Sequence, residues 1–187
     1  MKKILIIGSD GNLAKCIIDE IKSLNFKLFK ISRKEIDFNS STSKLLLNRL
    51  LKKIEPNIII NCVGVFKNND FDFESMFKLN TKISWDLIDH YRLNRKKKIK
   101  IILIGSSAYN KPRKNYILYV ASKSALNSIV KSSKDLFLKS KIELEIINPP
   151  AMKSKMRDQF YKSNKIKKKK RKEINPMIIA RKIINKF

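Results

Sequence analysis

A serine, a tyrosine and a lysine are the residues of this chain whose types and spacing best suit proton transfer. Ser106 follows an apolar run, and the segment Tyr119-Val-Ala-Ser-Lys123 comes shortly after it. Residues four apart on a helix share a face, so we expect the Lys123 ammonium beside the Tyr119 hydroxyl. A phenol has an ordinary pKa of about 10, and a neighbouring cation typically lowers a pKa by about 1 to 3 units. The pattern predicts that Tyr119 exchanges a proton with a substrate oxygen to which Ser106 donates a hydrogen bond.

The four glycines of the chain stand where a nucleotide-binding site would need them. Gly8 and Gly11 follow the first apolar run, Gly64 follows the third, and Gly105 directly precedes the serine. Two glycines after a strand allow a tight turn and bring a pyrophosphate close to a helix N-terminus. The residues expected to hold a dinucleotide at this turn are Gly8, Asp10, Gly11, Asn12 and Leu13.

The elements that must position these residues follow from the apolar pattern. Short β-branched runs alternate with longer amphipathic ones, which is typical of a parallel sheet wrapped by helices. The expected strands are 3–7, 27–31, 57–61, 99–104 and 142–147. The expected helices are 12–24, 43–54, 73–93, 116–138 and one that begins at Pro176, with Asn175 as its N-cap. Right-handed crossovers favour an α/β fold of three layers, a doubly wound sheet whose ligand binds beyond the carboxyl ends of the strands.

The end of the second expected strand bears on the choice of cofactor. An Asp or Glu at this point would bind the ribose 2′-hydroxyl of NAD, but the sequence has Ser32-Arg33-Lys34. A hydroxyl and a guanidinium at Ser32 and Arg33 favour the 2′-phosphate of NADP. NAD stays open as an alternative because Glu35 follows directly.

Taken together and in this order, the motifs make the sequence resemble the short-chain dehydrogenase/reductase family over about residues 3–156. Tyr119 and Lys123 match the family's Tyr-x-x-x-Lys pair, Ser106 has the usual separation from the tyrosine, and Asn80 matches the fourth catalytic residue. The resemblance implies that Lys123 also binds the nicotinamide ribose and that Asn80 supports a proton-relay water. The other cofactor contacts that it implies are Asp37, Phe38, Asn61, Cys62, Val63, Gly64, Pro149 and Ser154.

Three features depart from the commonest members of that family. The spacing from Gly8 to Gly11 resembles extended and atypical branches, which include sugar-nucleotide reductases and epimerases. The usual Pro-Gly after the fifth expected strand is Pro-Pro at 149–150. The chain stops after the helix that begins near Pro176, where family members add a seventh strand. We therefore expect a Rossmann sheet that lacks the usual last strand.

Composition and charge narrow the class of protein. The length fits one NAD(P)-binding domain over residues 1–187. The net charge of +27 comes from lysines scattered over every segment, as an AT-rich genome would produce, and no basic motif is interleaved with aromatic residues, so a nucleic-acid partner is not expected. Only the run 165–172, in an expected substrate-side loop at about 150–175, is a separate feature. This run is either a solvated loop or a means of attracting an anionic substrate.

Metal, disulfide and membrane classes are disfavoured. Cys16 and Cys62 lie in apolar segments without further cysteines, which predicts core residues. The acidic group Asp70, Asp72 and Glu74 is typical of a helix N-terminus, so no metal site is expected. The apolar run that ends before the first glycine is too short for a secretion signal or a membrane span, and we expect a cytoplasmic protein.

These observations predict an NADP(H)-preferring oxidoreductase that interconverts a small carbonyl compound and its alcohol. We expect a homodimer formed through helices 73–93 and 116–138. A sugar-nucleotide reductase or epimerase remains an alternative within enzymes. A nucleotide-binding sensor or scaffold remains an alternative from a different class.

Overall fold

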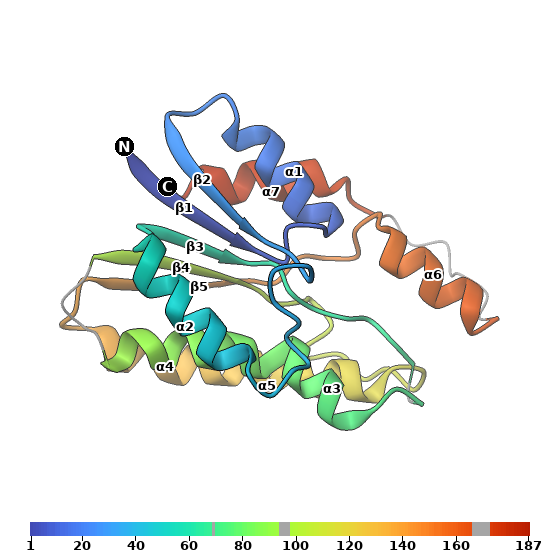
Figure 1. Cartoon of the computed structure of the whole chain (residues 1–187). Coiled ribbons are helices and arrows are strands. Elements are labelled where there is room, and N and C mark those ends of the chain that lie inside the picture. Colours follow the sequence, from blue (N-terminus) through green and yellow to red (C-terminus); the bar gives the residue numbers. More distant parts are fainter. Residues whose placement is uncertain (69, 94–97, 166–172) are drawn as a thin grey trace.

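A computed structural model of the chain describes residues 1–68, 70–93, 98–165 and 173–187 (Figure 1). Its sheet is built from β1 (Lys2–Ile7), β2 (Phe26–Ile31), β3 (Ile58–Asn61), β4 (Ile99–Ile104) and β5 (Ile142–Ile147). The strands are all parallel and lie in the order β2-β1-β3-β4-β5. The predicted doubly wound sheet is confirmed, with each strand within one residue of its expected bounds. Strand order reverses between β1 and β3, where sheets of this kind bind ligands.

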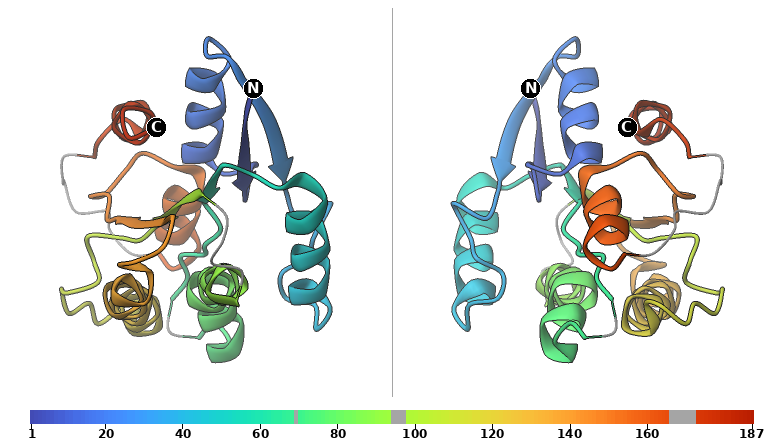
Figure 2. Two further views of the ribbon diagram at one scale, coloured as in Figure 1. Left: turned by 90° about the vertical axis from the view of Figure 1, so that its left-hand side faces the viewer. Right: turned by 90° about the vertical axis from the view of Figure 1, so that its right-hand side faces the viewer.

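Helices cover both faces of the sheet, as Figures 1 and 2 show. One face carries α1 (Asn12–Ile21) and α7 (Pro176–Ile184), and the other carries α2 (Ser43–Ile54), α3 (Phe73–Phe77), α4 (Ile83–Leu93) and α5 (Ile117–Lys134). As predicted, the Asn175 side chain caps α7 and Pro176 is at its start. A further helix, α6 (Lys155–Ser163), lies beyond the carboxyl ends of the strands.

The core consists of two apolar layers, one on each face of the sheet. Successive residues of a strand point to opposite faces. Ile4 and Ile6 of β1 pack on the side of α1 and α7, whereas Leu5 and Ile7 pack on the side of α2, α4 and α5. All four side chains are fully buried, as expected for a strand covered on both faces. Cys16 and Cys62 are partly buried and pack against the first of these layers.

The expected helix 73–93 is not continuous. Asp72 caps its first turn by accepting a hydrogen bond from the Ser75 N–H at 2.7 Å. The chain then forms a π-helical turn, Lys78–Lys82, between α3 and α4. Such a turn inserts an extra residue into the helix and is frequent at functional sites. Here it contains Asn80, which is almost fully buried.

The expected helix 116–138 and the expected loop 150–175 also differ in the structure. Helix α5 ends at Lys134 and continues as a short 3₁₀ turn, Asp135–Phe137. The loop prediction was wrong for α6, which begins after Ser154 because that side chain accepts a hydrogen bond from the Arg157 N–H. Of the run 165–172, all but its first residue lies outside the described residues.

The edge of the sheet and the helix lengths complete the outline of the fold. In the part of the chain that the structure describes, no strand follows β5, as the sequence led us to expect. Within the same residues, no helix combines the length and the apolar character that crossing a bilayer requires.

Candidate active site

The turn after β1 brings two loops into close contact. Gly8 has a φ of +79°, and its N–H donates to the carbonyl of Ile31 at 2.8 Å. A Cβ at Gly8 would lie 2.8 Å from the backbone nitrogen of Val63, so the loop after β3 leaves no room for a side chain there. Gly11 then forms the N-cap of α1, whose first N–H groups face the carboxyl end of the sheet. The two glycines therefore shape a turn that could receive a phosphate.

A groove runs across the carboxyl ends of β1 and β3. It consists of two adjacent cavities of about 340 Å³ and 180 Å³, which share Gly11 and the segment 62–65 as walls. The larger cavity is also lined by Gly8, Asp10, Ser32, Arg33, Asp37 and Phe38. The smaller cavity is also lined by Asn12, Leu13, Tyr119, Lys123 and Ser154. The structure thus brings nearly all of the expected cofactor residues to one groove, which passes the N-terminus of α1.

Ser32 and Arg33, which were expected to bind the 2′-phosphate of NADP, both line the larger cavity. The Ser32 hydroxyl and the Ser32 N–H both donate to Glu35 Oε2 at 2.6 Å. The same hydroxyl accepts a hydrogen bond from the Lys34 N–H at 3.1 Å. These bonds lower the pKa of the exposed Glu35 carboxyl. Ser32 is therefore occupied within its own turn, and Arg33 is the cationic side chain that lines the cavity.

Two buried asparagines hold the groove wall formed by residues 62–65. Asn61 Oδ1 accepts from the Val63 N–H at 3.1 Å, and its Nδ2 donates to the Ser84 hydroxyl at 2.9 Å. Asn80 pairs with the backbone of Val65 through both amide atoms, at 2.8 Å and 3.0 Å. Asn80 Nδ2 also lies 3.0 Å from the hydroxyl oxygen of Ser122. Asn80, expected to support a water, thus acts in this structure as a brace for the groove wall.

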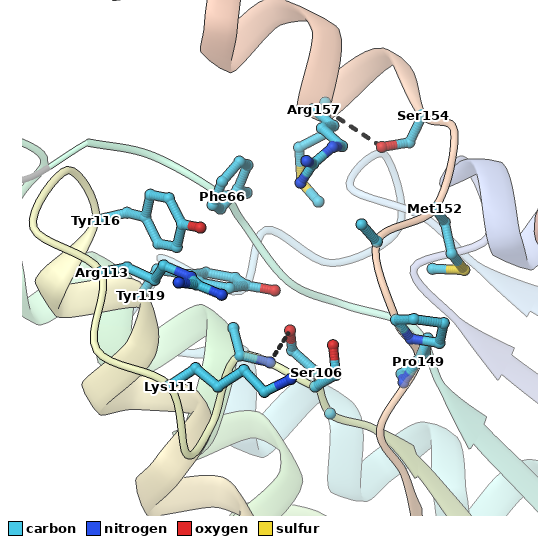
Figure 3. A pocket seen from close by; sticks show the side chains of 16 residues that line it. Phe66, Ser106, Lys111, Arg113, Tyr116, Tyr119, Pro149, Met152, Ser154 and Arg157 are labelled. Atoms are coloured by element: carbon cyan, nitrogen blue, oxygen red, sulfur yellow. Dashed lines mark hydrogen bonds between the residues drawn. The ribbon is translucent and has the colours of Figure 1, made fainter. Parts of the chain in front are cut away.

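Ser106 and Tyr119 meet at a separate cavity of about 280 Å³ that adjoins the groove (Figure 3). The Tyr119 hydroxyl points toward Ser106. Asn148 Oδ1 accepts the Ser106 N–H at 3.0 Å, while the Ser106 hydroxyl accepts the Ala108 N–H at 3.1 Å. Two hydroxyl groups can therefore reach one substrate oxygen in this cavity.

The pKa values at this site differ from the expectation. Burial raises the pKa of Tyr119, and the nearby Ser106 side chain offsets this only in part. The Lys123 ammonium does not act on Tyr119 here: its Nζ donates to the carbonyl of Ile104 at 3.0 Å. Burial lowers the pKa of Lys123 to about 8. The expectation of a lowered Tyr119 pKa was wrong for this structure, because desolvation outweighs the neighbouring charges.

Sequence reasoning missed a pair of asparagines that support Ser106. Asn148 Nδ2 donates to Asn127 Oδ1 at 3.0 Å, which orients Asn148 toward the serine. A Cβ at Gly105 would overlap Asn148 Oδ1, so this glycine makes room for an amide rather than for a cofactor. Two signals could have found the pair. Asn127 is four residues after Lys123 on the same helix face, and Asn148 directly follows β5.

The cavity wall opposite Ser106 is aromatic, and the sequence analysis did not foresee it. The Phe66 ring packs edge to face on Tyr116 and Tyr119, with centroids 4.9 Å and 4.8 Å apart, and lies 4.2 Å from that of Phe160 on α6. Of two expected cofactor residues, Pro149 lines this cavity and not the groove, whereas Ser154 lines both. No local pattern marks these aromatic residues, because they come from three distant segments.

The geometry defines a class of protein. A parallel sheet with a glycine turn at its switch point, a groove across it and a tyrosine–serine pair beside it make a Rossmann oxidoreductase. The family model for short chain dehydrogenase matches residues 2–165. The chain therefore belongs to the short-chain dehydrogenase/reductase family of NAD(P)-dependent oxidoreductases. No curated protein matches the sequence significantly.

Solved structures show the same fold at low sequence identity. A short chain dehydrogenase family protein from Francisella tularensis superposes with a TM-score of 0.80 and 19% identity, over 98% of this chain and 90% of the other. A 3-ketoacyl-(acyl-carrier-protein) reductase from Brucella melitensis, complexed with NADH, gives 0.76 and 18%, over 98% and 89%. A short chain dehydrogenase from Burkholderia cenocepacia, in complex with NADP, gives 0.77 and 14%, over 97% and 83%.

Proposed function

We propose that this enzyme is an NADP(H)-preferring reductase that converts a small carbonyl compound to its alcohol, and the reverse. The observation that carries the proposal is the Tyr119 hydroxyl, which points toward Ser106 in a cavity that adjoins the dinucleotide groove. When bound, the nicotinamide supplies the hydride. The chain's own residues must bind the carbonyl oxygen, supply its proton and hold the cofactor.

Tyr119 acts as the proton donor in this proposal. Its raised pKa keeps the phenol protonated at neutral pH, which is the form that carbonyl reduction requires. Ser106 donates a second hydrogen bond where negative charge develops on the substrate oxygen, and Asn148 holds the serine backbone in place. Lys123 lines the groove from α5, and in this proposal it binds the nicotinamide ribose. Alcohol oxidation needs Tyr119 deprotonated, so we expect its rate to rise with pH.

The direct test is consumption of NADPH by the purified chain with a panel of neutral aldehydes and ketones. We expect absorbance loss that depends on both the chain and the carbonyl compound. A chain that binds NADPH yet reduces no compound of a broad panel, neutral and charged, would contradict the proposed activity.

Arg33 is expected to set the cofactor preference. It lines the cavity beyond β2, whereas Glu35 is bound to Ser32 and does not line it. A guanidinium-to-phosphate contact is among the stronger polar contacts, so fluorescence titration should show NADPH binding roughly tenfold or more tightly than NADH. Arg33→Asp should abolish or reverse this preference. Lys34→Asp is the matched control, since it makes the same charge change at a residue outside the cavity lining and should leave most of the preference.

A homodimer formed through α4 and α5 is also part of the proposal. The two helices pack side by side on one face of the sheet. Their surface retains exposed apolar side chains, among them Trp85 and Ile117. We expect sedimentation at micromolar concentration to give twice the chain mass, and Ile117→Lys to shift the species toward monomer. A parent protein that sediments only at 21.9 kDa would exclude the dimer.

A further inference from the structure

The cavity that holds Ser106 and Tyr119 carries positive charge on several sides. Of the 16 residues that line it, three are cationic, namely Lys111, Arg113 and Arg157, and none of these described lining residues is acidic. Figure 3 shows Lys111 and Arg113 reaching in from the loop between β4 and α5, with Arg113 beside Tyr119 and Lys111 toward Ser106. Arg157 enters from α6 on the opposite side. Two separate segments of the chain, the loop between β4 and α5 and helix α6, thus direct cations at the place where substrate must bind.

The loop that carries the two nearer cations is held by its own hydrogen bonds. The Tyr109 N–H donates to the carbonyl of Ser106 at 3.1 Å, and the Lys111 N–H donates to that of Ala108 at 3.0 Å. The Tyr116 N–H donates to the carbonyl of Arg113 at 3.2 Å, just before α5 begins. These turns place both cations relative to the reacting hydroxyls, so the positive wall is part of the folded loop.

The three cations differ in how their charge is balanced. Arg157 is paired with Glu173, with 2.7 Å between Nε and Oε1, and both side chains are largely buried. A cation outside the cavity shows the same behaviour. Lys100, at the far end of the sheet, is partly buried, and its Nζ lies 2.8 Å from Glu143 Oε2. By contrast, among the described residues neither Lys111 nor Arg113 forms an ion pair, although Arg113 is half-buried. Partial removal of the Arg113 guanidinium from water without a counter-ion costs free energy. A bound anionic ligand would supply that counter-ion.

We propose that the substrate carries an anionic group, a carboxylate or a phosphate, which Arg113 and Lys111 bind while its carbonyl oxygen lies between Ser106 and Tyr119. This inference rests on the proposed reductase function and narrows it to a substrate class. The guanidinium of Arg113 offers the planar pair of donors that both anions accept. The aromatic wall of Phe66 and Tyr116 contacts the apolar part of the molecule that links the two ends.

The test uses three benzaldehydes that differ in their para substituent, two of them anionic and one neutral. They are para-formylbenzoate, para-formylphenyl phosphate and the neutral methyl para-formylbenzoate, each reduced with saturating NADPH. We expect kcat/KM for at least one anion to exceed that for the ester by roughly tenfold or more, as for a hydrogen bond to a charged group. The better of the two anions identifies the group. Equal kcat/KM for all three aldehydes would overturn the inference while leaving the reductase function intact.

Variants of Arg113 and Lys111 test whether these two side chains cause the preference for anionic aldehydes. Arg113→Gln, and Lys111→Gln to a smaller degree, should lower the ratio of the anion kcat/KM to the ester kcat/KM toward one. Lys134→Gln removes one positive charge from an exposed residue at the end of α5, outside the cavity, and should change none of the rates. An anion preference that survives in the Arg113→Gln, Lys111→Gln double variant would overturn the assignment.

A binding measurement covers the case in which no aldehyde is reduced. Ligand-observed NMR with phenyl phosphate, benzoate and methyl benzoate, in saturating NADPH, reports occupancy without turnover. Anion binding that the Arg113→Gln variant loses would support the anionic site even though the proposed reductase activity had failed. Indistinguishable signals from the ester and both anions in the parent protein would overturn it.

Discussion

Tyr119→Phe should lower kcat for carbonyl reduction by about 10² to 10⁴-fold, since a positioned proton donor contributes that much. The change removes one oxygen and keeps the ring that packs on Phe66, with centroids 4.8 Å apart, so the fold should persist. Cofactor affinity should stay nearly unchanged, because the groove walls beyond Tyr119 are intact. Steady-state kinetics with a confirmed substrate and NADPH titration measure the two effects separately.

Tyr116→Phe is the matched control for this prediction. Tyr116 lines the same cavity, with its ring centroid 6.1 Å from that of Tyr119, but it has no lysine four residues later. It should retain kcat within a few-fold, whatever its effect on KM. If Tyr119→Phe kept the parent kcat, or if Tyr116→Phe lost as much, Tyr119 would not be the proton donor.

Gly8→Ala should lower the free energy of unfolding by about 2 to 4 kcal/mol, because two costs coincide at this residue. The first is the φ of +79°, which L side chains rarely adopt. The second is the 2.8 Å approach of its Cβ to the Val63 nitrogen, a backbone atom that cannot rotate away. Chemical denaturation followed by circular dichroism measures the loss.

Gly11→Ala is the control for Gly8→Ala. It tests whether the stability loss comes from the strained backbone at Gly8 or whether any alanine in this turn is destabilising. Gly11 has a φ of −67°, and a Cβ there would make only an ordinary 3.4 Å contact with the Gly8 carbonyl. We expect a stability loss of about 1 kcal/mol or less, which is the N-cap difference between glycine and alanine. NADPH should bind more weakly to this variant, because Gly11 lines both cavities of the groove and the methyl group takes up space there. Equal destabilisation by the two alanines would refute the strain argument.

Most of the fold could be predicted from the sequence because its signals are local. A strand buried on both faces needs a continuous β-branched run such as the three isoleucines at 58–60, and the helices beside it need apolar residues at helical spacing. Caps are equally local, as the pair Asn175 and Pro176 shows at the start of α7. The polar residues after these strands then had to meet at one edge, because all strands of the sheet are parallel.

The parts that could not be predicted depend on contacts between distant segments. The π-helical turn at Lys78–Lys82 keeps Asn80 facing Val65 and Ser122, and neither partner can be read from the spacing within the helix. Helix α6 has a weakly apolar sequence, and it is fixed by Phe160 against Phe66 and by Arg157 against Glu173. In both places tertiary packing outweighs local preference.

The sequence by itself determined the sheet, the turn at Gly8 and the helical spacing of Tyr119 and Lys123, because each follows from the geometry of a few neighbouring residues. Only the tertiary structure decided the chemistry around them. Burial raised the Tyr119 pKa and turned Lys123 toward Ile104, since desolvation depends on everything packed around a group. The same packing directed Arg113 into the substrate cavity, a placement that a loop sequence does not encode.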